Sequence, residues 1–163
     1  MQSQLKRLGS DVPFFLKAHE HPSAIVRGLG DVLEPTPLDR TMHLTLILPD
    51  LHCQTADVYR KFDEMQPTPT LREIRAVNRS NGLLINDLTE PAFAVEPRLR
   101  ALRDRCVTAL DGRSVHMTGS GAALFTLHED ASGAIQAAAR LRERCSVAAV
   151  PVRTLDGREG NGR

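Results

Sequence analysis

The stretch that decides the fold is residues 114–152, SVHMTGSGAALFTLHEDASGAIQAAARLRERCSVAAVPV. Two short apolar runs flank Gly119-Ser120-Gly121, which is typical of two strands joined by a glycine loop. Asp130 is placed to cap a helix, and Ser146–Val152 has the apolar character of a further strand. The residues of this helix that we expect to face the core are Ala134, Ile135, Ala138 and Leu141. The stretch therefore predicts two strands, one helix and one strand.

Upstream of this stretch, Met42–Leu48 (MHLTLIL) is a strong strand candidate. Thr55 can cap a helix whose apolar face is formed by Val58, Phe62 and Met65. Further helices are expected at 71–78, from Asn86-Asp87-Leu88, and from Pro97, with an apolar stripe of Leu99, Leu102, Cys106 and Leu110. The whole order predicts an α+β fold, a mainly antiparallel four-stranded sheet with its helices on one face.

The first forty residues have a different character. Residues 4–8 have the pattern of a last helical turn that Gly9 stops, and Asp11-Val12-Pro13-Phe14-Phe15-Leu16 is an apolar segment with one acid. Residues 24–33 indicate two short strands around a glycine turn. At the other end, residues 153–163 have the composition of a disordered tail.

Composition excludes several classes of function. The chain has 163 residues, a net charge of +1 and 25% charged residues, so a general attraction to nucleic acid or to a membrane surface is not expected. Its apolar runs are too short to span a bilayer, and its first residues do not resemble a signal peptide. Three widely separated cysteines, Cys53, Cys106 and Cys145, are typical of buried thiols in a reducing compartment. We therefore predict a cytoplasmic location.

Three separated segments together carry a family resemblance. They are Leu8–Leu16 (LGSDVPFFL), Asn86–Ala92 (NDLTEPA) and Met117–Phe125 (MTGSGAALF). In order and spacing they resemble the 4-diphosphocytidyl-2-C-methyl-D-erythritol kinases, which belong to the superfamily of galactokinase, homoserine kinase, mevalonate kinase and phosphomevalonate kinase. The resemblance extends from Leu5 to about Val152, and the family usually has Ala at Ser10 and often an acid at Thr89.

The resemblance implies a domain organisation and an activity. Residues 1–38 would be a remnant of the N-terminal kinase domain carrying the acidic segment, and residues 39–152 the C-terminal α+β domain. The family transfers the γ-phosphate of ATP, held with Mg²⁺, to the 2-hydroxyl of its cytidyl substrate in non-mevalonate isoprenoid biosynthesis. The family's glycine-rich ATP loop lies upstream of the acidic segment and has no counterpart here, so we expect this chain to be a fragment that is inactive alone, with a possible homo-oligomer or a missing N-terminal half as its partner.

The resemblance also implies site residues, each with a plainer alternative. Asp11 would be the catalytic acid beside the substrate hydroxyl, or simply a turn cap after Gly9. Thr55 and Tyr59 lie four residues apart on one helix face and would bind substrate, Tyr59 by stacking on cytosine. The alternatives are a helix cap for Thr55 and a core position for Tyr59.

Other polar groups receive lesser roles. Gly119, Ser120 and Gly121 would support the phosphate loop by close backbone approach, or form an ordinary turn. His19-Glu20-His21 offers only two imidazoles in a polar loop, so no metal site is expected. The arginine-rich residues 98–105 are interpreted as a solvated face, with a nucleic-acid surface as the minor alternative.

The predicted function is therefore a kinase of the cytidyl substrate, present without its ATP loop. Two alternatives stay open: another small-molecule kinase of the superfamily, such as homoserine kinase, or a non-catalytic binding or regulatory domain derived from this family. Binding of a cytidine nucleotide without turnover would distinguish the last from an enzyme.

Overall fold

A computed structural model describes residues 11–17, 23–36, 40–65 and 84–155. These residues divide into a smaller unit, drawn from 1–42 and 153–163, and a larger unit, 43–152. The assignment of residues 1–38 as a kinase remnant, of 39–152 as a C-terminal domain and of 153–163 as a tail stays a prediction.

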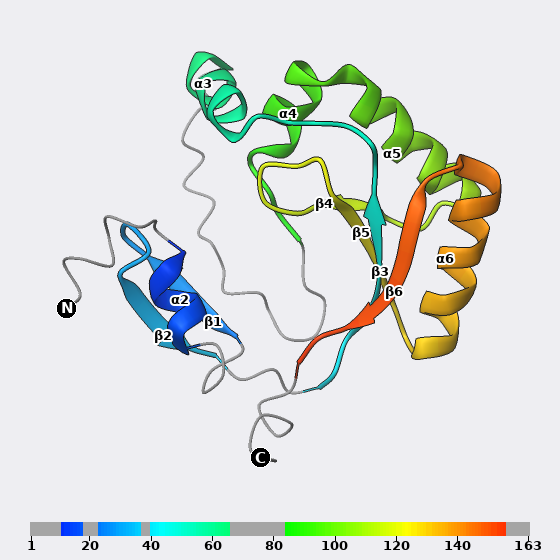
Figure 1. Cartoon of the computed structure of the whole chain (residues 1–163), viewed down its shortest axis with the longest axis horizontal. Helices are drawn as coiled ribbons and strands as arrows, with labels where there is room; N and C mark the ends of the chain where they lie inside the picture. The colour runs from blue at the N-terminus through cyan, green and yellow to red at the C-terminus, as the bar shows by residue number, and fades with distance from the viewer. Residues whose placement is uncertain (1–10, 18–22, 37–39, 66–83, 156–163) are drawn as a thin grey trace. The chain divides into compact units, whose positions relative to one another are not determined.

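The larger unit contains a four-stranded sheet in the order β4-β5-β3-β6. Its strands are β3 (His43–Leu48), β4 (His116–Met117), β5 (Leu124–His128) and β6 (Ala148–Arg153). β5 pairs antiparallel with both β3 and β4, and β6 runs in the opposite direction to β3 (Figure 1). The four predicted strands thus lie in one sheet, and the predicted α+β class is confirmed.

Each helix of this unit packs against the next helix along the chain. They are α3 (Thr55–Met65), α4 (Thr89–Val95), α5 (Pro97–Ala109) and α6 (Ala131–Cys145). α6 packs against β3 and β5, α5 against α6, α4 against α5 and α3 against α4, and α5 and α6 lie together on one side of the sheet (Figure 1). The expected helix at 71–78 and the helical turn at 4–8 fall outside the described residues.

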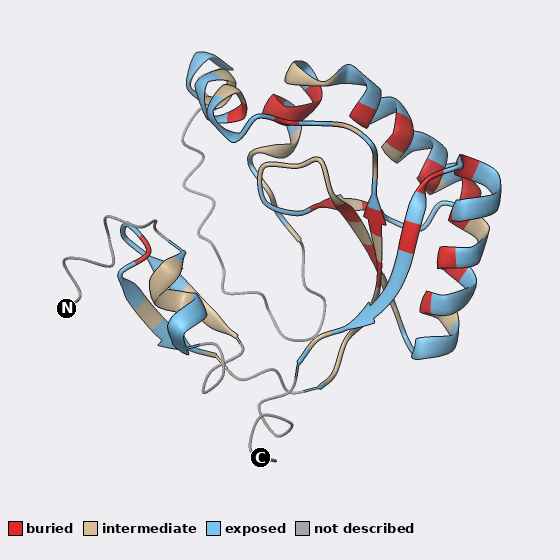
Figure 2. Cartoon of the chain, in the orientation of Figure 1, coloured by how far each residue is buried: buried red, intermediate tan, exposed pale blue. Residues whose placement is uncertain are grey.

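The core lies between the sheet and α4, α5 and α6. Because side chains alternate along a strand, Thr45 and Ile47 of β3 and Leu124 and Thr126 of β5 point toward the helices and are fully buried. The helices present matching buried stripes, visible as the red inward surfaces in Figure 2. α5 contributes Leu99, Leu102, Cys106 and Ala109, and α6 contributes Ala134, Ala137, Ala138, Leu141 and Cys145.

One residue of the predicted α6 face is wrong. Ile135 is 55% exposed, and Ala137 is buried in its place. The stripe at 134, 137, 138, 141 and 145 follows helical spacing, and Ile135 lies about 100° around the helix from Ala134 because each residue turns the helix by that angle. Its angle on the helix therefore places Ile135 on the exposed side, although its side chain is more hydrophobic than that of Ala137.

Two of the predicted helix starts, at Asp130 and at Pro97, are confirmed. Asp130 Oδ1 accepts a hydrogen bond of 2.8 Å from Gly133 N at the start of α6. Pro97 occupies the first turn of α5, where the missing N–H is not needed, and the Glu96 side chain accepts from Arg98 N. α6 ends at Cys145, and Ser146 follows as its C-cap in a left-handed conformation (φ 52°), which is common where helices end.

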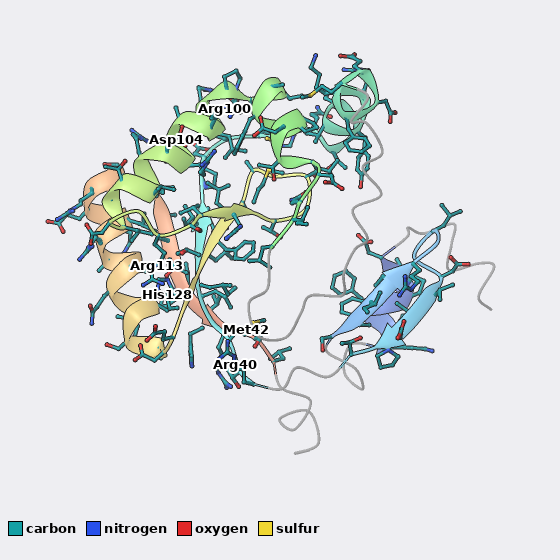
Figure 3. All side chains as sticks on the ribbon, turned by 180° about the vertical axis from the view of Figure 1, so that it is seen from behind. Arg40, Met42, Arg100, Asp104, Arg113 and His128 are labelled. Atoms are coloured by element: carbon teal, nitrogen blue, oxygen red, sulfur yellow. The ribbon has the colours of Figure 1, made fainter. Side chains whose placement is uncertain are left out.

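A polar contact crosses this core at the start of α6. Thr45 Oγ1 donates to the carbonyl of Ala134 (2.9 Å) and therefore accepts from His128 Nε2 (2.9 Å), because a hydroxyl has a single proton. Arg113, which donates to the carbonyl of Leu127 at 3.0 Å, lies near His128 (Figure 3). The Thr45 hydroxyl thus fixes the proton of His128 on Nε2.

The smaller unit contains a short helix and a hairpin. α2 (Val12–Lys17) has no buried residue, and β1 (Ala24–Arg27) pairs antiparallel with β2 (Val32–Pro35), as the sequence predicted. Within the turn, Asp31 Oδ1 accepts from Leu29 N at 2.9 Å. Across all the described ranges, no helix is both long and apolar enough to cross a membrane.

Candidate functional site

The site is built around the loop that joins β4 to β5, residues 118–123. Gly119 (φ 57°) and Gly121 (φ 88°) have left-handed conformations, and the loop closes through Gly121 N to the carbonyl of Thr118 (3.1 Å). A Cβ on Gly121 would lie 3.0 Å from Met117 Sδ and 3.4 Å from Cys53 Sγ, whereas one on Gly119 would meet nothing within 4 Å. Gly121 is therefore needed for packing, and Gly119 faces open space.

Asn86 holds this loop from one side. Its Nδ2 donates to the carbonyls of Gly119 (2.8 Å) and Met117 (3.1 Å). Its Oδ1 accepts from Leu88 N at 3.0 Å, just before α4 begins. One amide thus ties the glycine loop to the start of a helix, which joins two of the three segments that carried the family resemblance.

Thr55 holds the loop from the other side. It is the first residue of α3, and its Oγ1 lies 3.0 Å from Ser120 Oγ, within hydrogen-bonding distance. The structure therefore brings together two predicted site residues that are 65 positions apart in the chain. The Thr55 hydroxyl thus connects α3 to the β4–β5 loop. The helix-capping alternative does not account for this contact.

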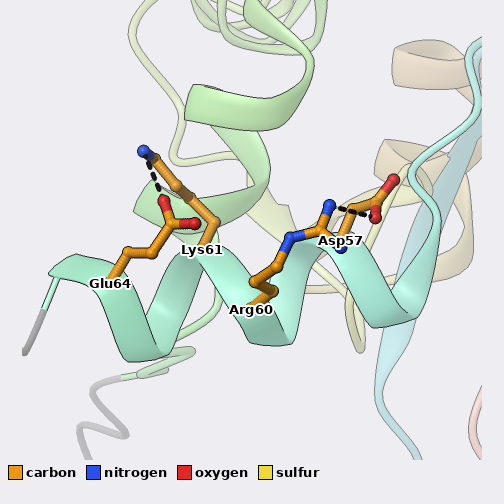
Figure 4. Close-up of polar contacts among 4 residues, drawn as sticks. All are labelled: Asp57, Arg60, Lys61 and Glu64. Atoms are coloured by element: carbon orange, nitrogen blue, oxygen red, sulfur yellow. Dashed lines mark hydrogen bonds and ion pairs between the residues drawn. The ribbon is translucent and has the colours of Figure 1, made fainter.

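Tyr59 lies one turn further along α3 and is 53% exposed. The alternative that placed Tyr59 in the core is wrong, because the buried position of this helix is Val58. The rest of the exposed surface of α3 carries the ion pairs Asp57–Arg60 (2.6 Å) and Lys61–Glu64 (3.0 Å), shown in Figure 4. An exposed ring on such a polar helix is available to a ligand.

Asp11 belongs to the smaller unit. It directly precedes α2, and its carbonyl accepts from Phe14 N (3.1 Å) and Phe15 N (3.2 Å). The residue is exposed. The plainer alternative, a turn cap after Gly9, involves a residue outside the described ranges and stays a prediction. The expectation that Asp11 borders one groove with Thr55 and Tyr59 stays a prediction.

Two features of the site were missed by the sequence analysis. Cys53 is buried beneath the loop, and burial, with a smaller effect of Glu96, raises the pKa of its thiol. A cavity of about 680 Å³ has Asn86, Met117, Phe93, His116 and Arg103 among its lining residues. Burial lowers the pKa of His116. In the sequence this grouping was indicated by the Asn86 and Met117 segments alone, and the link between them depends on tertiary contact.

Among the described residues, no group of three or more His, Cys, Asp and Glu side chains could hold a metal ion. The His19-Glu20-His21 segment lies outside those residues. The negative expectation for a metal site there stays a prediction.

Comparison with known proteins agrees with this architecture. The model of the family described as "GHMP kinases C terminal" matches residues 68–147. A crystal structure of 4-(cytidine 5'-diphospho)-2C-methyl-D-erythritol kinase has a TM-score of 0.71 and 32% sequence identity, covering 91% of this chain and 54% of that one.

Curated relatives carry the same name. The 4-diphosphocytidyl-2-C-methyl-D-erythritol kinase of Citrifermentans bemidjiense is 33% identical over 152 residues, covering 91% of this chain and 53% of the relative. The chloroplastic/chromoplastic enzyme of Solanum lycopersicum is 34% identical over 133 residues, covering 76% of this chain and 32% of the relative. The chain thus spans between about a third and about half of the length of these relatives. Residues 68–147 thus match the C-terminal domain of the GHMP kinases, and the chain is similar to a part of the 4-diphosphocytidyl-2-C-methyl-D-erythritol kinases.

Proposed function

We propose that this chain supplies the substrate-binding side of an ATP-dependent kinase that phosphorylates the 2-hydroxyl of 4-diphosphocytidyl-2-C-methyl-D-erythritol. The observation that carries the proposal is the attachment of the glycine loop to both α3, through Thr55 and Ser120, and the start of α4, through Asn86. Three polar segments far apart in the chain converge there, which an ordinary strand-to-strand turn does not require.

Tyr59 and Thr55 are the residues we assign to the substrate. A tyrosine ring can stack on any nucleobase, and such stacking contributes about 1–3 kcal/mol per base. The ring of Tyr59 is exposed, one helical turn from the Thr55 hydroxyl. We place the cytosine on Tyr59 and the methylerythritol part toward Thr55.

Asp11 is the residue we assign to the chemistry. A carboxylate beside the substrate hydroxyl orients it for in-line attack and accepts its proton as the new phosphate ester forms. Asp11 is an exposed residue of the smaller unit, directly before α2. This role requires the smaller unit to bring Asp11 to the substrate held by the larger one.

The triphosphate of ATP is not fitted by the described residues alone. Triphosphates are normally held by a glycine-rich loop that opens a helix, whereas Gly119–Gly121 joins two strands. We therefore give this loop a supporting role beside the phosphates. ATP, with the Mg²⁺ that usually accompanies it, supplies the phosphoryl group.

A small-molecule partner fits the surface better than nucleic acid or a membrane. The arginines of α5 are balanced by acids, since Arg98 pairs with Glu96 and Arg100 with Glu90, each at 2.5 Å. Arg103 and Arg100 also cover the ring of Phe93, at 5.4 and 4.8 Å from its centre. These guanidinium groups already have partners, which argues against a continuous basic surface.

The substrate assignment is tested by calorimetric titration of the chain with the cytidyl substrate. Replacing Tyr59 by Leu should weaken binding by about 5- to 150-fold, the equivalent of the lost stacking, whereas Tyr59→Phe keeps the ring and should bind nearly as the wild type does. Equal affinities for all three proteins would contradict the assignment. Homoserine in place of the cytidyl substrate should show no Tyr59-dependent binding, and a Tyr59-dependent response to it would favour the other superfamily kinases.

The same samples distinguish an enzyme part from a non-catalytic binding domain. The chain by itself should bind the cytidyl substrate and release little ADP from ATP. Turnover by the chain that disappears in Asp11→Asn would show that ATP is held in a way that contradicts our assignment of the loop.

A further inference from the structure

Two cysteines meet where α5 packs against α6. Cys106 lies in the third turn of α5 and is fully buried, and Cys145 is the last residue of α6 and is 5% exposed. Both are free thiols within the same hydrophobic core. Nothing in the proposed kinase function uses either of them.

A cleft adjoins Cys145, one of the two thiols. It has a volume of about 440 Å³ and is lined by Cys145 together with Arg105, Thr108 and Ala109 of α5, and by Asp104 and Arg144. Arg105 and Ala109 stand one residue before and three residues after Cys106, so Cys145 faces the turn of α5 that carries the other thiol. The cleft therefore reaches Cys145, whereas Cys106 does not line it and is fully buried.

The two thiols also influence each other. Burial raises the pKa of Cys106 to about 12, and the neighbouring Cys145 thiol adds to this increase, while Arg105 acts in the opposite direction. Cys145 is therefore a near neighbour of Cys106. A deeply buried thiol of this kind reacts slowly with an oxidant but can still resolve an oxidised neighbour.

We propose that Cys106 and Cys145 form a redox-sensitive thiol pair, which a hydroperoxide converts to a disulfide that joins α5 to α6. The site is independent of the kinase proposal, because it lies on the helical layer and shares no residue with the glycine loop. Cys53, the third thiol, packs under Gly121 and serves as the internal reference.

The reaction balances with hydrogen peroxide as the oxidant. The Cys145 sulfur, as thiolate, attacks one peroxide oxygen, the O–O bond breaks, and the departing hydroxide takes up a proton to form water. The Cys106 sulfur then attacks the sulfenic sulfur of Cys145, the S–O bond breaks and a second water leaves. Two thiols have lost two electrons and two protons, and one peroxide has been reduced to two waters.

Tryptic mapping of the full chain tests the proposal directly. Cleavage after Arg105 and Arg144 isolates the two thiols in short peptides, CVTALDGR and CSVAAVPVR, and leaves Cys53 in a separate peptide, residues 41–60. The folded protein is treated with hydrogen peroxide, free thiols are blocked in denaturant, and the digest is analysed by mass spectrometry without reduction. We expect CVTALDGR linked to CSVAAVPVR, with Cys53 still reduced.

Variants and thermal unfolding complete the experiment. Cys53→Ser should still form the link, while Cys145→Ser should lose it and leave Cys106 reduced. The oxidised wild type should unfold at least about 5 °C higher than the reduced protein, reversibly with dithiothreitol, because the new bond closes a long loop. A Cys145 oxidised to sulfinic acid without any link, or a link through Cys53, would overturn the proposal, and the wild-type map alone decides this if Cys145→Ser fails to fold.

Discussion

At the scale of single residues, two threonines on neighbouring strands differ in the hydrogen bonding of their hydroxyl groups. Thr45 and Thr126 are cross-strand partners and both are fully buried. The Thr45 hydroxyl makes two hydrogen bonds, whereas Thr126 Oγ1 has no partner within the described part of the chain. A buried polar group without a partner costs about 1–3 kcal/mol. The Thr45 hydroxyl therefore stabilises the fold, whereas the Thr126 hydroxyl destabilises it.

This contrast gives a matched pair of substitutions. Thr126→Val removes an unsatisfied hydroxyl with almost no change of shape and should raise the free energy of unfolding by about 1 kcal/mol. Thr45→Val strands the carbonyl of Ala134 and the His128 N–H and should lower it by about 1–3 kcal/mol. Urea denaturation of both variants measures the two changes, and a destabilised Thr126→Val would mean that its hydroxyl has a partner after all.

The histidines of the sheet predict how stability depends on pH. Burial lowers the pKa of His116, and burial with the charge of Arg113 lowers that of His128, against a smaller opposite effect of Asp130. The fold therefore favours the neutral imidazoles, and the unfolded chain binds protons more readily. Stability is fully present above the unfolded pKa of about 6.5 and is lost as the pH falls through that value toward the lower folded pKa values.

We expect the urea midpoint to be lower at pH 5.5 than at pH 7.5, and the difference to shrink in His128→Gln, which keeps a donor for Thr45. His52→Gln changes an exposed histidine and should leave the difference as it is. A midpoint that does not change between these pH values would contradict the burial argument for both residues.

At the scale of elements, the Asn86 amide connects the glycine loop to α4. Asn86→Ala removes both donors to the loop and the acceptor for Leu88 N. Because this residue is only partly buried, water can replace some of these bonds, and we expect a loss of about 1–2 kcal/mol in the free energy of unfolding. Asp87→Ala, at the exposed neighbouring position, is the control for the change in helix start, and equal effects of the two substitutions would argue against the role of the amide.

The elements themselves were largely predictable, and their contacts were not. The strands at 43–48 and 124–128 followed from apolar runs, and α6 followed from the Asp130 cap and its helical stripe. Ile135 was predicted to face the core because it is hydrophobic, but its angle on the helix places it outside the buried stripe. The meeting of Thr55 with Ser120, and of Asn86 with Gly119, depends on how α3, α4 and the sheet pack, which local spacing does not encode. The same holds for Cys106 beside Cys145.

At the scale of the whole molecule, the apolar surface of α2 predicts self-association. Phe15 is 69% exposed and Leu16 54% exposed, and no residue of this helix is buried. Large exposed apolar surface favours association, so the chain should form dimers or larger species in sedimentation velocity. Phe15→Ser with Leu16→Ser should shift it toward monomer, whereas Lys17→Ser, on the same helix, should not. A wild-type protein that sediments as a clean monomer would contradict this prediction.

The central claim is that this chain carries a working substrate side of a cytidyl-substrate kinase. The most direct measurement is ADP release, with ATP, Mg²⁺ and the cytidyl substrate, by a chimera. In it the part of the Citrifermentans bemidjiense kinase that precedes the matched region is joined to this chain. We predict turnover that depends on the cytidyl substrate and falls by about 10²–10⁴-fold in the Asp11→Asn chimera, because a general base contributes that much. A folded chimera that binds the cytidyl substrate but releases no ADP, or one whose turnover is unchanged by Asp11→Asn, would contradict the claim.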